Sequence, residues 1–234
     1  RDSRRLIEAE SADAAGVFVF EGRRDSDHAL VTARKGILMG AMQVHGRAAH
    51  AGEEPEKGAS AIVEAADKIL RLPRLNDPAG GTVVNVGTVA GGTVANQIPD
   101  HCSAQIDVRF KTEANGERVS QQIADIMADT AIAGTRTEYN LVTARPPFVQ
   151  TAEGRRLLDG YKQAARDFGL DFAERAAGGG SDANLTAALG VPTLDGLGPE
   201  GDGAHTQHEY IVRQSFLDSI KVFALFLSRS IVTS

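Results

Sequence analysis

Glu21 and His205 are the residues of this sequence whose types and positions best suit metal chemistry. Glu21 follows the continuous apolar run 17–20, and His205 lies in a glycine-rich stretch near the chain end. Carboxylate and imidazole are ordinary zinc ligands, and a carboxylate that ends a buried strand lies where open α/β sheets bind ligands. Two donors are too few for a zinc site, however, and Glu21 taken alone is better explained as the start of a solvated loop.

The surroundings of His205 allow two further interpretations. His208 follows three residues later and is a second candidate ligand, although the Glu-Tyr dipeptide after it indicates an edge or loop. Residues 196–201 also match the G-x-G-x-x-G pattern of dinucleotide-binding folds. That pattern must open a helix, whereas Pro199 and the stretch 202–207 predict a loop, so we expect no dinucleotide site.

Three polar residues in the middle of the chain could act on a substrate. His50 precedes a predicted helix and could donate a hydrogen bond to a developing oxyanion, or it could be an ordinary surface histidine. Arg109 ends the polar face of a predicted strand. Its guanidinium could bind a substrate carboxylate through two parallel hydrogen bonds, or it could pair with Asp107. Asn96, in a loop between strands, is undecided on its own.

A glycine loop leads into a predicted helix at Gly178, Gly179, Gly180 and Ser181. Backbone amides at a helix N-terminus favour anions, including a substrate carboxylate. A tight turn that only packs closely explains the loop equally well. The loop is no nucleophile elbow, because G-x-S-x-G would need glycine at the position of Ala183.

Hydrophobic periodicity predicts an α+β unit in the first two thirds of the chain. Strict alternation over 101–110 indicates a strand with one covered face, and apolar residues at helical spacing over 58–70 indicate an amphipathic helix. Further strands are expected near 37–44, 82–89 and 135–143, and a further helix near 115–129. The order β-α-β-β-α-β is that of a ferredoxin-like split unit.

The remaining segments predict a mostly parallel α/β sheet. The run 17–20 has the continuous apolar character of a strand buried on both faces. After the stiff linker 145–147 the pattern changes to helix, strand, helix, strand, helix, ending near 214–230, as in parallel α/β folds. The sheet that begins at 17–20 would therefore be interrupted by the split unit and resumed after Pro147.

Composition points to a small-molecule partner. The 234 residues are 42% hydrophobic and 24% charged with a formal net charge of -6, and they show no basic stripe of the kind that binds nucleic acid. No apolar run approaches the roughly 20 residues of a membrane span. We therefore expect neither a nucleic-acid nor a membrane partner. Because the single cysteine, Cys102, cannot close an internal disulfide, we expect a cytoplasmic protein.

Five short motifs occur in order across nearly the whole chain and resemble one family. They are residues 17–21 (VFVFE), 46–52 (GRAAHAG), 96–99 with 107–109 (NQIP and DVR), 178–182 (GGGSD) and 203–206 (GAHT). Together they resemble the dinuclear zinc peptidases and amidohydrolases, a family that includes glutamate carboxypeptidase, acetylornithine deacetylase, succinyl-diaminopimelate desuccinylase and aminoacylase. The likeness to the glutamate carboxypeptidase branch is strongest.

The resemblance implies a catalytic zinc domain, residues 1–35 and 147–234, interrupted by a lid and dimerisation domain at 36–146. It implies two zinc ions, with Glu21 a ligand of one and His205 a ligand of the other. Cobalt or manganese would also suit such donors. It further implies a hydrolase that cleaves an amide or peptide bond and releases a carboxylate-bearing amino acid.

The resemblance also assigns roles to the other candidates. His50 would reach the active site of a partner subunit as the oxyanion donor, while Arg109 and Asn96 would hold the substrate carboxylate with help from the loop Gly178 to Ser181. The helix that begins at Gly58 and the strand 82–89 would form the contact of a homodimer.

The chain departs from the family pattern at its start. The pattern requires an earlier His-x-Asp, a bridging aspartate and a Glu-Glu pair that supplies the general base, and all of these should precede Arg1. We therefore expect this polypeptide alone to bind zinc poorly and to be inactive. The alternative function is a non-catalytic dimerisation or ligand-binding fragment of such a protein.

Overall fold

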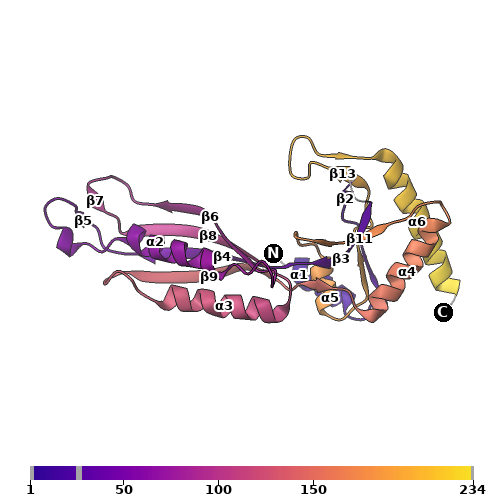
Figure 1. Ribbon diagram of the computed structural model, residues 1–234, viewed down its shortest axis with the longest axis horizontal. Coiled ribbons are helices and arrows are strands. Elements are labelled where there is room, and N and C mark those ends of the chain that lie inside the picture. Colours follow the sequence, from indigo (N-terminus) through magenta and orange to yellow (C-terminus); the bar gives the residue numbers. More distant parts are fainter. Residues whose placement is uncertain (1–2, 25–27, 233–234) are drawn as a thin grey trace. The chain divides into compact units, whose positions relative to one another are not determined.

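The computed structural model describes residues 3–24 and 28–232, and the chain divides into two compact units (Figure 1). The discontinuous unit comprises residues 1–35 and 146–234, and the inserted unit comprises residues 36–145. The chain thus leaves one unit after Lys35 and returns to it at Pro146.

The inserted unit is built on a four-stranded antiparallel sheet. Its long elements are, in order, β4 (Gly36–His45), α2 (Ala61–Arg71), β6 (Val83–Gly91), β8 (His101–Phe110), α3 (Glu113–Ala128) and β9 (Arg136–Arg145). The sheet order is β6-β8-β4-β9, so β8 lies between β4 and β6, the two strands that α2 connects. This is the split arrangement of ferredoxin-like folds, and the predicted α+β fold of the insertion is confirmed.

The alternation over 101–110 decides which face of this sheet is covered. Cys102, Ala104, Ile106, Val108 and Phe110 are buried in one core with side chains of both α2 and α3. The residues between them on β8 are half-exposed or exposed. Because successive side chains of a strand point to opposite faces, both helices cover the same face, and the other face of the sheet is open.

Helix α2 differs from the sequence-based expectation. Its buried side chains are Ala61, Glu64, Ala65 and Lys68. Of the apolar residues at helical spacing over 58–70, Ala59 is buried and Ile69 packs against the core, but Ile62, Val63 and Leu70 are 40%, 53% and 68% exposed. Periodicity detects which residues share one side of a helix, but it does not show which side meets the sheet. Here the side with a buried ion pair faces inward.

The buried pair joins α2 to the C-terminal end of α3. The Lys68 ammonium lies 2.6 Å from the Glu64 carboxylate and donates to the carbonyl oxygens of Ile126 and Asp129. Glu64 accepts from the backbone N–H groups of Ala131 and Ile132. Burial tends to raise the pKa of the Glu64 carboxyl, but the hydrogen bonds from Lys68 and these amides hold that pKa below its ordinary value.

The inserted unit also carries short elements at the edges of the sheet. Strands β5 (Ala49–His50) and β7 (Gln97–Ile98) form a separate two-stranded sheet. Two 3-10 turns, η1 (Pro55–Lys57) and η2 (Leu72–Leu75), precede and follow α2. Ser60 and Thr112 cap α2 and α3 by accepting from backbone N–H groups of the first turn, as N-cap hydroxyls commonly do.

The discontinuous unit contains a mixed sheet flanked by helices. Its elements are α1 (Ser3–Ser11), β1 (Val17–Val19), β2 (Arg23–Arg24), β3 (Ala29–Arg34), β10 (Phe148–Val149), α4 (Ala152–Arg166), β11 (Ala173–Ala177), α5 (Ala183–Ala188), β12 (Thr193–Asp195), β13 (Glu200–Asp202), β14 (Tyr210–Ile211) and α6 (Arg213–Val232). The α/β class is confirmed. In the core, Phe18 of β1 makes edge contacts with Phe223 and Phe226 of α6.

The main sheet is mixed rather than mostly parallel. Strand β1 is parallel to β12 and β11 is parallel to β3, but β12 and β10 are antiparallel to β3. Strand β3 was not predicted from the sequence. The chain leaves the unit after β3 and re-enters beside it, with Phe148 opposite Arg34, so the returning strand β10 must run in the opposite direction.

Among residues 3–24 and 28–232, no helix combines the length and the apolar character that crossing a membrane requires.

We predict that Glu64→Gln destabilises the protein by about 3–5 kcal/mol, because it leaves the Lys68 ammonium buried without its counter-charge. The measurement is the urea midpoint, and Glu117→Gln on the exposed side of α3 is the matched control. Since folding lowers the pKa of Glu64, its stabilisation is present above the unfolded value of about 4.3 and is lost as the pH falls through the folded value. Equal midpoints for both variants would contradict the role of the pair.

Candidate metal and substrate sites

Glu21 is held at the carboxyl end of β1 by the loop that follows β12. The backbone N–H groups of Leu197 and Gly198 donate to the carbonyl oxygens of Val19 and Glu21. A Cβ atom on residue 198 would lie 2.5 Å from the carbonyl oxygen of Phe20, so only glycine permits this approach. In the apolar run before Glu21, residues 17–19 are half-buried and Phe20 is exposed, so the run is not buried on both faces; β1 pairs only with β12 in the described sheet.

His205 lies on the loop between β13 and β14 in a left-handed backbone conformation. Its φ is 66°, and that of Gly203 is 72°. The turn is held by hydrogen bonds from the backbone N–H and hydroxyl of Thr206 to the carbonyl oxygen of Gly203. A positive φ is uncommon in residues other than glycine, and such outliers concentrate at functional sites.

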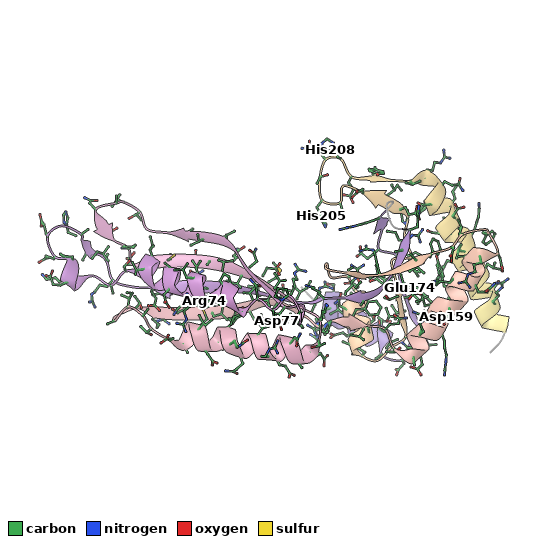
Figure 2. The ribbon with its side chains drawn as sticks, viewed as in Figure 1. Arg74, Asp77, Asp159, Glu174, His205 and His208 are labelled. Atoms are coloured by element: carbon green, nitrogen blue, oxygen red, sulfur yellow. The ribbon has the colours of Figure 1, made fainter. Side chains whose placement is uncertain are left out.

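Glu21 and His205 line the same pocket. The walls also include two further carboxylates, Asp202 and Glu209, and the arginines Arg23, Arg24 and Arg175. His208 is not among the lining residues, and Figure 2 shows it at another point of the same loop. Residues about 180 positions apart in the sequence are brought together because β2 pairs with β13 in a small sheet next to β1.

The donors in this pocket are of types that suit a divalent metal ion, but they do not converge on one point. Carboxylate and imidazole are appropriate ligands for zinc, which binds three or four protein donors. In the part of the chain that the structure describes, no three His, Cys, Asp or Glu side chains lie close enough together to hold a metal ion. The described residues therefore do not form a complete metal centre by themselves.

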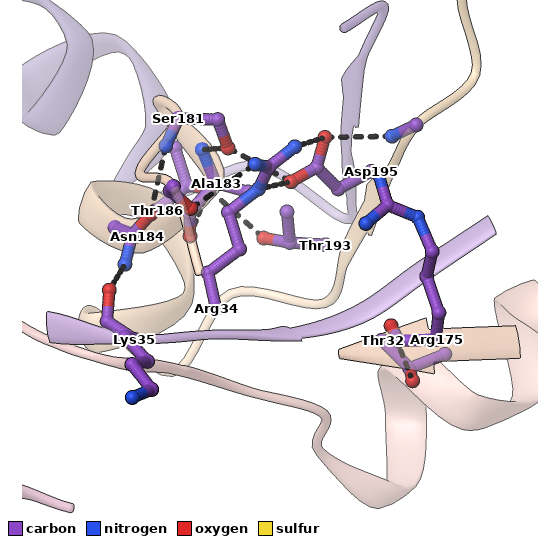
Figure 3. Close-up of polar contacts among 12 residues, drawn as sticks. Thr32, Arg34, Lys35, Arg175, Ser181, Ala183, Asn184, Thr186, Thr193 and Asp195 are labelled. Atoms are coloured by element: carbon purple, nitrogen blue, oxygen red, sulfur yellow. Dashed lines mark hydrogen bonds and ion pairs between the residues drawn. The ribbon is translucent and has the colours of Figure 1, made fainter. Parts of the chain in front are cut away.

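The discontinuous unit contains a buried ion pair, between Arg34 and Asp195, that was not predicted from the sequence. Figure 3 shows the Arg34 guanidinium on the Asp195 carboxylate, with Nε 2.5 Å from Oδ2 and Nη2 3.2 Å from Oδ1. Arg34 also donates to the carbonyl oxygen of Gly179, and Ser181 Oγ donates to Asp195. The only sequence feature that indicated a role for Asp195 was its position directly after a predicted strand.

The loop Gly178 to Ser181 is only partly available to a ligand. Ser181 is 4% exposed, and its hydroxyl both donates to Asp195 and accepts from the backbone N–H of Ala183. Gly178, Gly179 and Gly180 are exposed, and a Cβ atom on Gly178 or Gly179 would meet nothing within 4 Å. Backbone groups of the glycines, rather than the serine side chain, are the atoms that could face a substrate.

His50 has a defined tautomer. Its Nδ1 accepts hydrogen bonds from the backbone N–H groups of Gly52 and Glu53, at 3.2 and 3.1 Å. An imidazole nitrogen that accepts carries no proton, so in the neutral ring the proton is on Nε2. His50 therefore presents an N–H donor from an exposed position in β5, as an oxyanion donor requires.

Asn96 lies beside His50, whereas Arg109 lies at the other end of β8. The carbonyl oxygen of Asn96 accepts from the N–H of Ala51, and Gln97 is opposite His50 in the two-stranded sheet. Strand β8 begins at His101, and eight residues at about 3.4 Å each place Arg109 roughly 27 Å further on. One copy of the chain therefore cannot bring Asn96 and Arg109 to a single carboxylate.

Arg109 makes the local pair that the sequence left open. Its Nε and Nη2 donate to both carboxylate oxygens of Asp107, at 2.9 to 3.1 Å. Both side chains keep about a third of their surface exposed. Nη1 is not used in this pair, so the guanidinium retains N–H groups for a second carboxylate.

Comparison with known proteins agrees with this fold. Residues 32–135 match the family model of the peptidase dimerisation domain. Carboxypeptidase G2 of Pseudomonas sp. strain RS-16 is 30% identical over 214 residues, which cover 89% of this chain and 51% of that protein. YqjE of Bacillus subtilis is 33% identical over 172 residues, 71% of this chain and 44% of that protein. The chain thus spans about half the length of these relatives.

Solved structures show the same fold. The aminopeptidase PepT of Bacillus cereus has a TM-score of 0.75 at 24% identity and covers 95% of this chain, which covers 61% of that one. A tripeptidase of Staphylococcus aureus has a TM-score of 0.76 at 22% identity, covering 92% and 56% respectively. The match to the M20 peptidase dimerisation domain and the similarity to carboxypeptidase G2 confirm the resemblance to the glutamate carboxypeptidase branch of this peptidase family.

We predict that His50 carries its proton on Nε2 when neutral, because two backbone amides occupy Nδ1. The measurement is a long-range proton–nitrogen NMR spectrum of the imidazoles, recorded well above the ordinary imidazole pKa of about 6.5, with His50→Ala to assign the signal. A spectrum in which His50 is protonated on Nδ1 would contradict this geometry.

Proposed function

We propose that the chain is part of a metal-dependent hydrolase that cleaves an amide or peptide bond and releases a carboxylate-bearing amino acid. The observation that carries the proposal is the convergence of Glu21 and His205 in one pocket. In this proposal each residue is a ligand of one of two zinc ions, or of cobalt or manganese in their place. The remaining ligands and the general base come from outside the described residues, and this chain alone binds the metal poorly.

The proposed roles of the other residues follow from their own geometry. His50 Nε2–H donates to the oxygen that becomes negative as the amide is attacked, and this donor is worth most in the transition state. Arg109 binds the substrate carboxylate through the N–H groups that Asp107 leaves available. Exposed backbone of Gly178, Gly179 and Gly180 lies next to Ser181, which positions the loop.

The proposed active site combines two copies of the chain. His50 and Asn96 are neighbours on the β5–β7 sheet, so both come from the same subunit, and Arg109 lies far from them along β8. We propose that His50 and Asn96 act in trans, on a substrate held by Arg109 of the other subunit. In this arrangement Asn96 and Arg109 still bind the same substrate carboxylate, but each comes from a different subunit.

The surface for this homodimer is the exposed side of α2 together with β6. Ile62, Val63 and Leu70 expose apolar surface on α2, and Val89 is 60% exposed on β6. Strand β6 is at the edge of its sheet, and an unpaired edge beside apolar residues favours pairing with another chain. Two-fold symmetry would place the same residues on both sides of the contact.

The kinetic test uses the full product of the reading frame that encodes this sequence. We expect hydrolysis of N-acyl amino acids or peptides with a free carboxylate, a kcat lowered about 10²–10³-fold by His50→Ala, and a KM raised by Arg109→Ala. An equal mixture of His50→Ala and His205→Ala chains should recover about a quarter of wild-type activity, because half the dimers then hold one intact site of two. No hydrolysis by the wild type would overturn the proposed function, and no recovery would overturn action in trans.

For the dimer, we expect Val63→Glu to convert it to a monomer, because a buried unpaired carboxylate opposes association. Light scattering after gel filtration measures the mass, and Glu117→Lys on α3 is the control for a change of surface charge. A dimer that survives Val63→Glu with unchanged mass would place the interface elsewhere.

A non-catalytic dimerisation module is the second candidate. Two observations favour it: the matched family model covers only the dimerisation segment, 32–135, and the described residues hold no three-donor metal cluster. An encoding reading frame that starts near Arg1 would support the module, whereas upstream His-x-Asp and Glu-Glu motifs would support the enzyme.

A further inference from the structure

A pair of histidines, His45 and His101, faces the open side of the sheet in the inserted unit. His45 ends β4 and His101 begins β8, and the two residues are direct partners in the antiparallel register. Their ring centroids lie 5.7 Å apart with the ring planes at 64°. Directly opposed residues of antiparallel strands keep their Cβ atoms within about 5.5 Å, so the sheet backbone holds the two rings close together.

Three side chains surround the pair. Gln43 Oε1 lies 2.8 Å from His101 Nε2, and Glu138 Oε2 lies 4.0 Å from His45 Nε2. Arg136, opposite His45 on β9, pairs with the other oxygen of Glu138. The histidines are thus accompanied by one amide oxygen and by a carboxylate whose charge Arg136 partly neutralises.

The separation of the rings fits a shared metal ion. With metal–nitrogen bonds of about 2.1 Å, each ring centroid lies about 3.2 Å from the metal, and a tetrahedral angle puts the centroids about 5.2 Å apart. The observed centroid distance of 5.7 Å is slightly longer than this, and a small rotation of the two side chains would remove the difference. As the side chains stand, no three His, Cys, Asp or Glu side chains of the described residues are in metal-binding range, so a metal ion held here would have the two imidazoles as its protein ligands and water in the rest of its shell.

We propose that His45 and His101 form a binding site for a first-row transition metal ion of the zinc, copper or nickel class. Imidazole nitrogen favours these ions over magnesium or calcium, which prefer oxygen donors. Binding through His101 Nε2 displaces the hydrogen bond to Gln43, and the ring proton moves to Nδ1, so the neutral imidazole binds without net proton loss. The carboxylate of Glu138 offsets part of the charge of the bound ion.

The site lies at the root of the small sheet that carries His50. His45 is the last residue before the segment that leads to β5, and His101 follows the segment that leaves β7. The next contact beyond the pair is the hydrogen bond from the Gly46 N–H to the carbonyl oxygen of Asp100. A metal ion bound by both histidines therefore links β4 and β8 at the point where the chain continues into the β5–β7 sheet. The site does not depend on the proposed hydrolase activity.

The test is a titration of the whole chain with zinc ions, followed by calorimetry and by the imidazole NMR signals. We expect His45→Ala and His101→Ala each to weaken binding by at least about tenfold, since loss even of a group that orients a ligand costs 10–100-fold. His205→Ala is the matched control and should leave this binding unchanged. Both histidines are solvent-accessible, and equal urea midpoints will verify that the variants fold.

Hydrogen exchange gives a second readout. On addition of zinc, the amides of residues 46–51, 96–98 and 100 should exchange more slowly in the wild type and in His205→Ala, but not in His101→Ala. An unchanged zinc affinity in both His45→Ala and His101→Ala would overturn the site, and so would a binding event that only His205→Ala removes. Unchanged hydrogen exchange in the zinc-bound protein would contradict the proposed link between β4 and β8.

Discussion

The ion pair of Arg34 with Asp195 is the interaction on which the discontinuous unit depends. It is buried, with side-chain exposures of 8% and 0%, and it joins β3 to β12 at the point where the chain leaves for the insertion. Ser181 donates to the same carboxylate, and its backbone N–H donates to Asn184, whose amide donates to the carbonyl oxygens of Lys35 and Pro146. A buried charge without its partner is strongly destabilising. Removal of the Arg34 or Asp195 side chain would therefore disturb the glycine loop and also the two segments, at Lys35 and Pro146, where the chain passes between the units.

The inserted unit depends on a similar buried pair with a different consequence. Glu64 and Lys68 occupy the core-facing side of α2 and bind the backbone at the end of α3. Since a helix has one core-facing side, the apolar residues Ile62, Val63 and Leu70 are left on the solvent side. The buried ion pair and the exposed apolar residues of α2 therefore have one cause, and this explains how a unit with its own core also exposes apolar side chains.

The candidate metal pocket arises from backbone packing rather than from side-chain attraction. Gly198 allows the loop after β12 to contact the backbone at Glu21, and the pairing of β2 with β13 brings the turn of His205 beside it. The substrate-binding candidates are distributed differently: the length of β8 separates Arg109 from His50 and Asn96. The candidates of one chain therefore form two groups, near opposite ends of a ten-residue strand.

Sequence alone determined the features that depend on local periodicity and on short motifs. The alternation over 101–110, the ferredoxin-like order of the insertion, and the placement of Glu21 after a strand all follow from side-chain patterns that repeat within a few residues. Tertiary structure decided the rest: that α2 turns its charged side inward, that β3 exists and makes the sheet mixed, that Asn96 stays with His50, and that Ser181 uses its hydroxyl on Asp195. A pattern along the chain shows which residues share a face. Which neighbour covers that face depends on packing between segments that are distant in sequence, and no local period records it.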